Sequence, residues 1–169
     1  MFIEMKKQVL NFGIGKAELW FRYDIQALYN IENSGFDPFD IFKQRDNPKA
    51  VRCFLENGLA DWYKGVDDNN SLDEYVNRLM SMEGFQTELI AYIQAAIMLS
   101  LPNQRGSSKE KREKFSILSL MTACVDVMRM PMSEFMSSTI REASDRWERY
   151  AVAMGYRKPV ETFKEFDDE

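Results

Sequence analysis

Histidine is absent from the sequence, and this absence excludes a large part of enzyme chemistry. Histidine is the commonest general base, the usual partner of a serine or cysteine nucleophile, and the commonest zinc ligand. The carboxylates of Asp37, Asp40, Glu56 and Asp61 could supply acid–base groups instead, but acidic residues on helix faces are usually solvated. We therefore expect a protein that is not an enzyme, with no catalytic residues, no cofactor and no metal.

Cysteine is scarce, since only Cys53 and Cys124 occur and neither belongs to a CxxC pair. Free cysteines in a reducing compartment usually behave as small buried apolar residues, and we favour this interpretation. A disulfide bond or a reactive thiol is the alternative.

Long apolar runs are missing as well. The longest one, residues 89 to 101, contains Gln94 and Ser100 and is shorter than the roughly 20 residues that span a bilayer. The N-terminal stretch MFIEMKKQVLNFG has no apolar run of signal-peptide length. These features predict a cytoplasmic protein without a membrane partner.

Positive charge is in short supply, with a net charge of −5 and a pI of about 5.0. Binding of nucleic acid requires clustered cations that neutralise phosphates. The cationic cluster Lys109 to Lys114 is interrupted by two glutamates, which favours a solvated linker. The acidic stretch DDNNSLDEY, residues 67 to 75, is not a calcium loop, because Leu72 and Arg78 stand where such a loop needs Gly and Glu. We therefore expect neither nucleic acid nor calcium as a ligand.

Helical spacing of apolar residues dominates what is present. The fold class that we predict is mainly α, a helical domain of six or seven helices with a possible short N-terminal β-hairpin around Gly13 to Gly15. The expected helices cover about residues 23–33, 48–63, 71–82, 85–101, 115–129, 133–136 and 139–154.

Several residues fix the ends and packing of these helices. Asn47-Pro48 is a helix start signal. Ser71–Glu74 and Thr139–Glu142 each have the pattern of a capping box, and Gly155 follows the last helix as a C′ residue would. Gly58 lies inside an apolar helical stripe, where Gly costs about 1 kcal/mol relative to Ala. We therefore expect a close packing contact at Gly58.

The composition of PNQRGSSKEKRE divides the chain into two helical parts, because Pro, Gly, Ser and charged residues are typical of linkers. We predict an N-terminal hairpin plus helical domain over 1–101, a linker over 102–114, a C-terminal helical subdomain over 115–156, and a flexible acidic tail over 157–169.

Methionine is abundant in the second part. Met-rich helical stripes are often core, but they also form deformable surfaces that receive a partner helix. Both interpretations stay open. The second one names these candidate partner-binding residues: Met121, Met128, Met130, Met132, Phe135, Met136 and Trp147.

The order of segments "LWFRYDIQALYNIENSGFDPFDIF" and "NPKAVRCFLENGLADWY" resembles the first half of tail assembly chaperones from long-tailed bacteriophages. In that family a β-prone start leads into a helix of the type F-x-Y-D-x-x-A-L-x-x-I-E, and an L-x-x-G-L-like segment follows, matched by Leu55 to Leu59. "VMRMPMSEFMSSTIREASDRWERY" is similar to the downstream piece of those chaperones. Two features depart from the family pattern: Met136 replaces a common aromatic residue, and a linker joins the halves.

The resemblance implies a helical chaperone that binds and solubilises the phage tape measure protein while tail tube subunits polymerise around it. It further implies that the protein acts in the bacterial host cytoplasm and is absent from the mature virion. A tail tube subunit and a homo-oligomer are further partners to consider. The alternative is a phage-encoded regulatory or anti-defence protein that binds a host protein through an acidic face, which includes Asp67, Asp68 and residues 165 to 169.

Overall fold

The computed structural model describes residues 7–11, 16–59, 72–82, 84, 86–102 and 117–157. This part of the chain is mainly helical, as predicted, and contains seven α-helices. The elements are β1 (Lys7–Asn11), β2 (Lys16–Trp20), α1 (Ile25–Asn33), the 3-10 helix η1 (Phe42–Gln44), α2 (Pro48–Gly58), α4 (Leu72–Met80), α5 (Gln86–Ser100), α6 (Ile117–Met121), the π-helix η2 (Thr122–Val127), α7 (Met132–Ser137) and α8 (Ile140–Ala153).

Strands β1 and β2 form the predicted hairpin. They pair antiparallel, with Lys7 opposite Trp20 and Asn11 opposite Lys16. The second helix is shorter than the expected 48–63, because α2 ends at Gly58 with Leu59 as its C-cap. The Gly-containing connection of the hairpin lies outside the described residues, as do residues 60–71, which include Ser71 of the first capping box.

Helix ends follow the capping signals of the sequence. The Asp24 side chain accepts a hydrogen bond from the Ala27 N–H at 2.8 Å and begins α1. At α8 the Glu142 N–H donates to Thr139 Oγ1 at 3.2 Å, while the Thr139 N–H donates to Glu142 Oε2 at 2.8 Å. The second predicted capping box is therefore confirmed.

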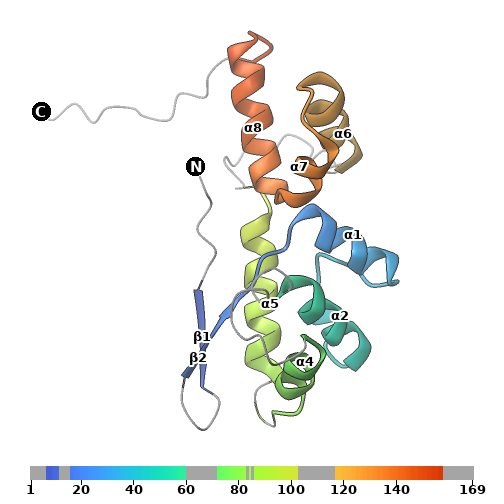
Figure 1. Ribbon diagram of the computed structural model, residues 1–169, viewed down its shortest axis with the longest axis vertical. Coiled ribbons are helices and arrows are strands. Elements are labelled where there is room, and N and C mark those ends of the chain that lie inside the picture. The colour runs from blue at the N-terminus through green and yellow to red at the C-terminus, as the bar shows by residue number, and fades with distance from the viewer. Residues whose placement is uncertain are drawn as a thin grey trace, which may run out of the picture.

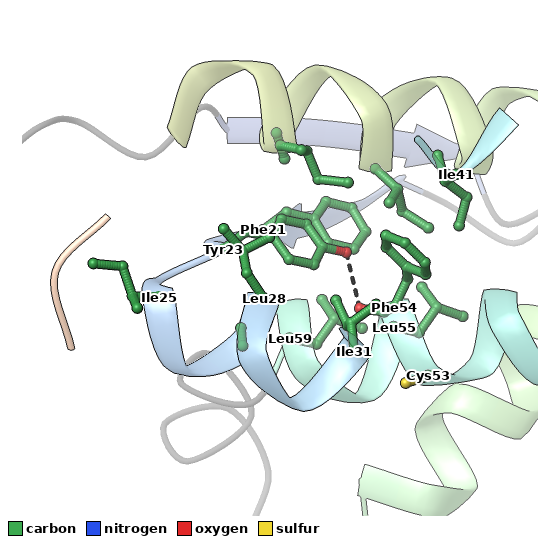
Figure 2. Close-up of a cluster of buried hydrophobic side chains, with 14 of the residues drawn as sticks. Phe21, Tyr23, Ile25, Leu28, Ile31, Ile41, Cys53, Phe54, Leu55 and Leu59 are labelled. Carbon is green, nitrogen blue, oxygen red and sulfur yellow. Dashed lines mark hydrogen bonds between the residues drawn. The ribbon is translucent and has the colours of Figure 1, made fainter. Parts of the chain in front are cut away.

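The centre of the core lies between α1, α2 and α5 (Figure 2). The buried Tyr23 hydroxyl donates a hydrogen bond of 2.8 Å to the carbonyl of Phe54, and the two rings meet edge to face at 6.3 Å. A Cβ on Gly58 would lie only 2.5 Å from Cζ of Tyr23. The close packing contact predicted at Gly58 is therefore confirmed, and its partner is the Tyr23 ring.

Residues 117–157, which we call the C-terminal subdomain, pack onto the helical body of residues 21–102 (Figure 1). The guanidinium of Arg22 donates two hydrogen bonds of 2.9 and 2.7 Å to the carboxylate of Glu142, and a third of 3.0 Å to the carbonyl of Ser137. On α8, Arg141 Nε donates to the Leu101 carbonyl at 2.7 Å, directly after α5. One hydrophobic cluster includes side chains of both parts.

The expected helix over residues 115–129 is not a uniform α-helix. It changes from α6 into the π-helix η2, where the Met128 N–H donates to the carbonyl of Ala123, five residues earlier, at 3.0 Å. Arg129 then adopts the left-handed conformation with φ 60°, and the Met130 N–H donates to the Cys124 carbonyl at 3.0 Å. The wider turn and the left-handed residue redirect the chain into α7.

Candidate partner-binding surface

Exposed large apolar side chains are concentrated on the C-terminal subdomain. Among the described residues it carries six of the ten such side chains, although it is the smaller of the two parts. Single exposed apolar residues are normal on protein surfaces, so the observation is their uneven distribution between the two parts. These six, the exposed apolar set, are Leu118, Val127, Met132, Val152, Met154 and Tyr156.

The C-terminal end of α8 is built to present part of this set. Gly155 has φ 74°, and the Tyr156 N–H donates to the Ala151 carbonyl at 2.7 Å, which folds the chain back over the helix. The Tyr156 ring therefore lies 6.4 Å from the Tyr150 ring, and Tyr150 stacks on Trp147 at 5.9 Å. The predicted C′ role of Gly155 is confirmed, and its consequence is an ordered aromatic row along α8.

The residues proposed from the methionine pattern are divided between core and surface. Met130 and Phe135 are buried, with exposed fractions of 8% and 1%, whereas Met132 is 46% exposed. The remaining four are partly buried and pack against the core: Met121, Met128, Met136 and Trp147. The structure thus brings most of the seven together inside the subdomain, and only Met132 of them belongs to the exposed apolar set.

The other five members of the exposed apolar set were missed by the sequence pattern, which followed the density of methionine. A signal was available at the end of α8. Val152, Met154 and Tyr156 surround Gly155, and an apolar residue directly after a C′ glycine commonly packs back on the last turns of the helix, as Tyr156 does on Tyr150.

Three of the four carboxylates considered for acid–base chemistry form ion pairs with basic side chains. Asp40 lies 3.0 Å and Asp37 4.0 Å from Lys43 Nζ, and hydrogen bonding from Lys43 lowers the pKa of Asp40 below its usual value. Glu56 pairs with Arg52 at 2.7 Å. Asp61 lies outside the described residues.

Both cysteines are free and buried, as the favoured interpretation expects. The Cys124 thiol donates to the Ala143 carbonyl at 3.6 Å, and burial raises the pKa of this thiol. A raised pKa keeps the thiol protonated and poorly reactive. Across the described ranges, no group of three or more Cys, Asp or Glu residues is placed to hold a metal ion.

Comparison with known proteins gives no relative. No protein-family model, no curated protein and no solved structure matches this chain. Within the described segments, no helix is both long enough and apolar enough to cross a membrane.

Proposed function

We propose that this protein is a bacteriophage tail assembly chaperone that binds the tape measure protein and keeps it soluble during tail assembly in the host cytoplasm. The observation that carries the proposal is the concentration of exposed apolar side chains on the C-terminal subdomain. The sequence resemblance of residues 19–42, 47–63 and 127–150 to that family supplies the identity of the partner.

The surface suits a partner that must be held and then released. Full burial of one large apolar side chain contributes about 1.5–3 kcal/mol, and much of this is offset by the loss of translational and side-chain freedom on association. Six partly exposed side chains therefore support reversible binding rather than a permanent complex. Met121, Met128 and Met136 of the same subdomain are partly buried, and their flexible side chains can change rotamer and fit helical stripes of different sequence.

Co-expression with an aggregation-prone helical fragment of the tape measure protein tests the proposal. We expect the wild-type protein to keep the fragment soluble. The triple variant Leu118→Ser, Met132→Gln, Met154→Gln should weaken binding at least about tenfold, because three apolar contacts are lost. Tyr29→Ser with Met98→Gln is the matched control, since both residues are exposed on the helical body.

Two results would count against the proposal. One is a fragment that stays insoluble beside the wild-type protein, and the other is a triple variant that binds as well as the control. Steep weakening of binding by salt would instead favour the alternative acidic-face protein. Asp67, Asp68 and residues 165–169, on which that alternative depends, lie outside the described residues.

A further inference from the structure

Residues 22–25, which we call the coupling segment, lie between β2 and α1 (Figure 1). Hydrogen bonds connect this segment on one side with the C-terminal end of α2, and on the other side with the turn between α7 and α8. The contacts on the two sides are made by the same or neighbouring residues. A displacement of the segment by α2 therefore changes its contacts with the C-terminal subdomain.

The side toward α2 fixes the backbone of the segment. The Arg22 N–H donates to the carbonyl of Gly58, the last residue of α2, at 3.1 Å. The last carbonyls of a helix have no partner inside the helix, so this hydrogen bond completes the end of α2. The next residue, Tyr23, is fully buried, and its hydroxyl donates to the Phe54 carbonyl at 2.8 Å (Figure 2). The position of Arg22 is therefore set by the last turn of α2.

The side toward the subdomain is formed by the Arg22 side chain and the Ile25 backbone. The guanidinium donates to both carboxylate oxygens of Glu142, at 2.9 and 2.7 Å, and to the Ser137 carbonyl at 3.0 Å. The Ile25 N–H donates to the Ser138 carbonyl at 2.9 Å, and both of these carbonyls belong to the end of α7. The Arg22 and Glu142 side chains are only 22% and 16% exposed, so salt and water weaken their ion pair less than a surface pair.

The contact between Arg22 and Glu142 depends on alignment. A guanidinium binds a carboxylate through two parallel hydrogen bonds, which requires the two planar groups to face each other. Glu142 is held in place, because its carboxylate also accepts from the Thr139 N–H in the capping box of α8. Arg22, in turn, extends from a backbone position that α2 fixes. A shift of the Tyr23 ring or of the Arg22 backbone would therefore misalign the pair.

Apolar side chains are covered where the two parts meet. α7 packs on α1, α8 packs on α5, and one hydrophobic cluster contains residues of both the helical body and the subdomain. Among its members in the subdomain, Phe135 on α7 and Ile140 on α8 are 1% and 0% exposed. Opening of the joint between the two parts would bring apolar surface of this cluster into water.

We infer that the coupling segment is a conformational device by which the end of α2 controls how often the C-terminal subdomain opens from the helical body. In the closed form the Arg22 guanidinium holds Glu142 and the end of α7, and the apolar side chains between the two parts are covered. Displacement of Tyr23 by α2 withdraws the guanidinium, and the subdomain then opens. The device consists of the chain's own residues, acts without a partner, and does not depend on the proposed function.

Amide hydrogen exchange at Ile25, followed by NMR, measures opening of the joint, because the acceptor of this N–H belongs to the subdomain. The Leu28 N–H, which donates to a carbonyl at the start of α1, is the internal reference. Arg22→Ala should accelerate exchange at Ile25 at least about tenfold, because three hydrogen bonds from a charged group are lost. Exchange at Leu28 should stay within about twofold of wild type. Arg52→Ala is the matched control, since Arg52 forms an ion pair with Glu56 inside the body, and it should leave Ile25 unchanged.

Tyr23→Phe tests the control by α2, because it removes one hydrogen bond to α2 and none to the subdomain. We expect exchange at Ile25 to accelerate about threefold relative to exchange at Leu28. In the Arg22→Ala background the same substitution should have no further effect at Ile25, because the connection is already broken. Gly58→Ala, which places a Cβ against the Tyr23 ring, should act in the same direction and more strongly.

Three results would overturn the inference. Equal acceleration at Ile25 and Leu28 would show that the whole body loosens. Acceleration by Arg22→Ala but not by Tyr23→Phe would show a static contact that α2 does not influence. A full effect of Tyr23→Phe in the Arg22→Ala background would show that the two sides of the segment act independently.

Exposure of the covered side chains has a readout of its own. The dye ANS, which binds exposed apolar surface, should bind to Arg22→Ala more than to the wild-type protein, and to Arg52→Ala as much as to the wild-type protein. Unchanged dye binding by Arg22→Ala, together with faster exchange at Ile25, would mean that opening leaves the hydrophobic cluster covered, and it would overturn the inference as well.

Discussion

The helical body and the C-terminal subdomain use their apolar residues differently. The body buries most of the core side chains, and among its described residues no buried side-chain polar atom lacks a hydrogen-bond partner: the Gln94 amide, for example, donates to the Phe39 carbonyl and accepts from the Ile41 N–H. The subdomain buries fewer side chains, exposes more, and contains a buried Ser144 hydroxyl without a hydrogen-bond partner. Because buried polar groups are almost always paired in stable interiors, the subdomain should be the less stable part. Apolar side chains that are exposed to solvent do not contribute to the core.

The largest effect is expected from removal of a buried ring in each part. Phe54→Ala in the body and Phe135→Ala in the subdomain each leave a cavity where the ring was. Each should lower the free energy of unfolding of the part that contains it by about 3–5 kcal/mol. Phe54→Ala should accelerate amide exchange throughout the protein, whereas Phe135→Ala should accelerate it mainly in residues 117–157, since the weaker part can open alone. Leu118→Ala, at an exposed position of the subdomain, is the control and should change little. Uniform acceleration by both ring deletions would show that the two parts are equally stable.

A second test increases packing in the body. Gly58→Ala places a Cβ 2.5 Å from Cζ and from the hydroxyl oxygen of Tyr23. The ring cannot move away without losing its hydrogen bond to Phe54, so we expect a loss of about 3 kcal/mol in the free energy of unfolding, at the upper end for overpacking.

Tyr23→Leu provides the matched background for this substitution. With the ring removed, Gly58→Ala should cost little or become favourable, because Ala is the better helix former by about 1 kcal/mol. Denaturant unfolding of the four proteins gives the coupling energy. Equal costs in both backgrounds would mean that the Tyr23 ring is not what requires glycine.

The position of Gly58 shows which features the sequence could predict. A glycine in a helical stripe, a Thr139–Glu142 capping box and a C′ Gly155 are local signals, and each acts within one or two turns of backbone. The distant residue that contacts such a position was harder to predict. Tyr23 lies far from Gly58 in the sequence, and the pattern required a close contact without naming the ring that makes it.

The candidate site was less predictable, for a physical reason. Met130 and Met132 are two positions apart and chemically identical, yet one is buried and the other is 46% exposed. Met130 ends the turn that follows the π-helix η2 and the left-handed Arg129, whereas Met132 is the first residue of α7, after its N-cap Pro131. No spacing of apolar residues signals a π-helix, because helical periodicity assumes a constant number of residues per turn.

The third prediction concerns the joint between the two parts. Partial burial by itself would raise the pKa of Glu142, but hydrogen bonds from Arg22 and from the Thr139 backbone outweigh burial and lower this pKa below its usual value of 4.5. A lowered carboxyl pKa stabilises the folded state above the unfolded pKa, and the contribution is lost as the pH falls through the folded pKa. The joint should therefore weaken below about pH 4.5.

Glu142→Gln should lower the free energy of unfolding by about 2 kcal/mol at pH 7, because the negative charge that strengthens the hydrogen bonds from Arg22 is lost, together with one of the two acceptor oxygens. The difference from wild type should shrink in acid, where the wild-type carboxyl is protonated as well. Glu134→Gln is the control, since its ion pair with Arg146 is half exposed and should contribute less than about 1 kcal/mol. Thermal unfolding between pH 3 and 7 measures both, and a Glu142→Gln deficit that is independent of pH would contradict the assignment.

The smallest effect on stability is expected from replacement of Arg129. This substitution distinguishes a residue that only turns the chain from one that also binds the partner. Arg129 is exposed and has φ 60° at a position where glycine is preferred, so Arg129→Gly should raise the free energy of unfolding by about 1 kcal/mol. Arg129→Ala keeps the Cβ and should give no gain. If Arg129→Gly stabilises the protein and also weakens binding of the tape measure fragment, the Arg129 guanidinium belongs to the partner surface. If stability rises while binding is unchanged, the strained residue serves only to turn the chain. No gain in stability would mean that contacts of the arginine side chain outweigh its backbone strain.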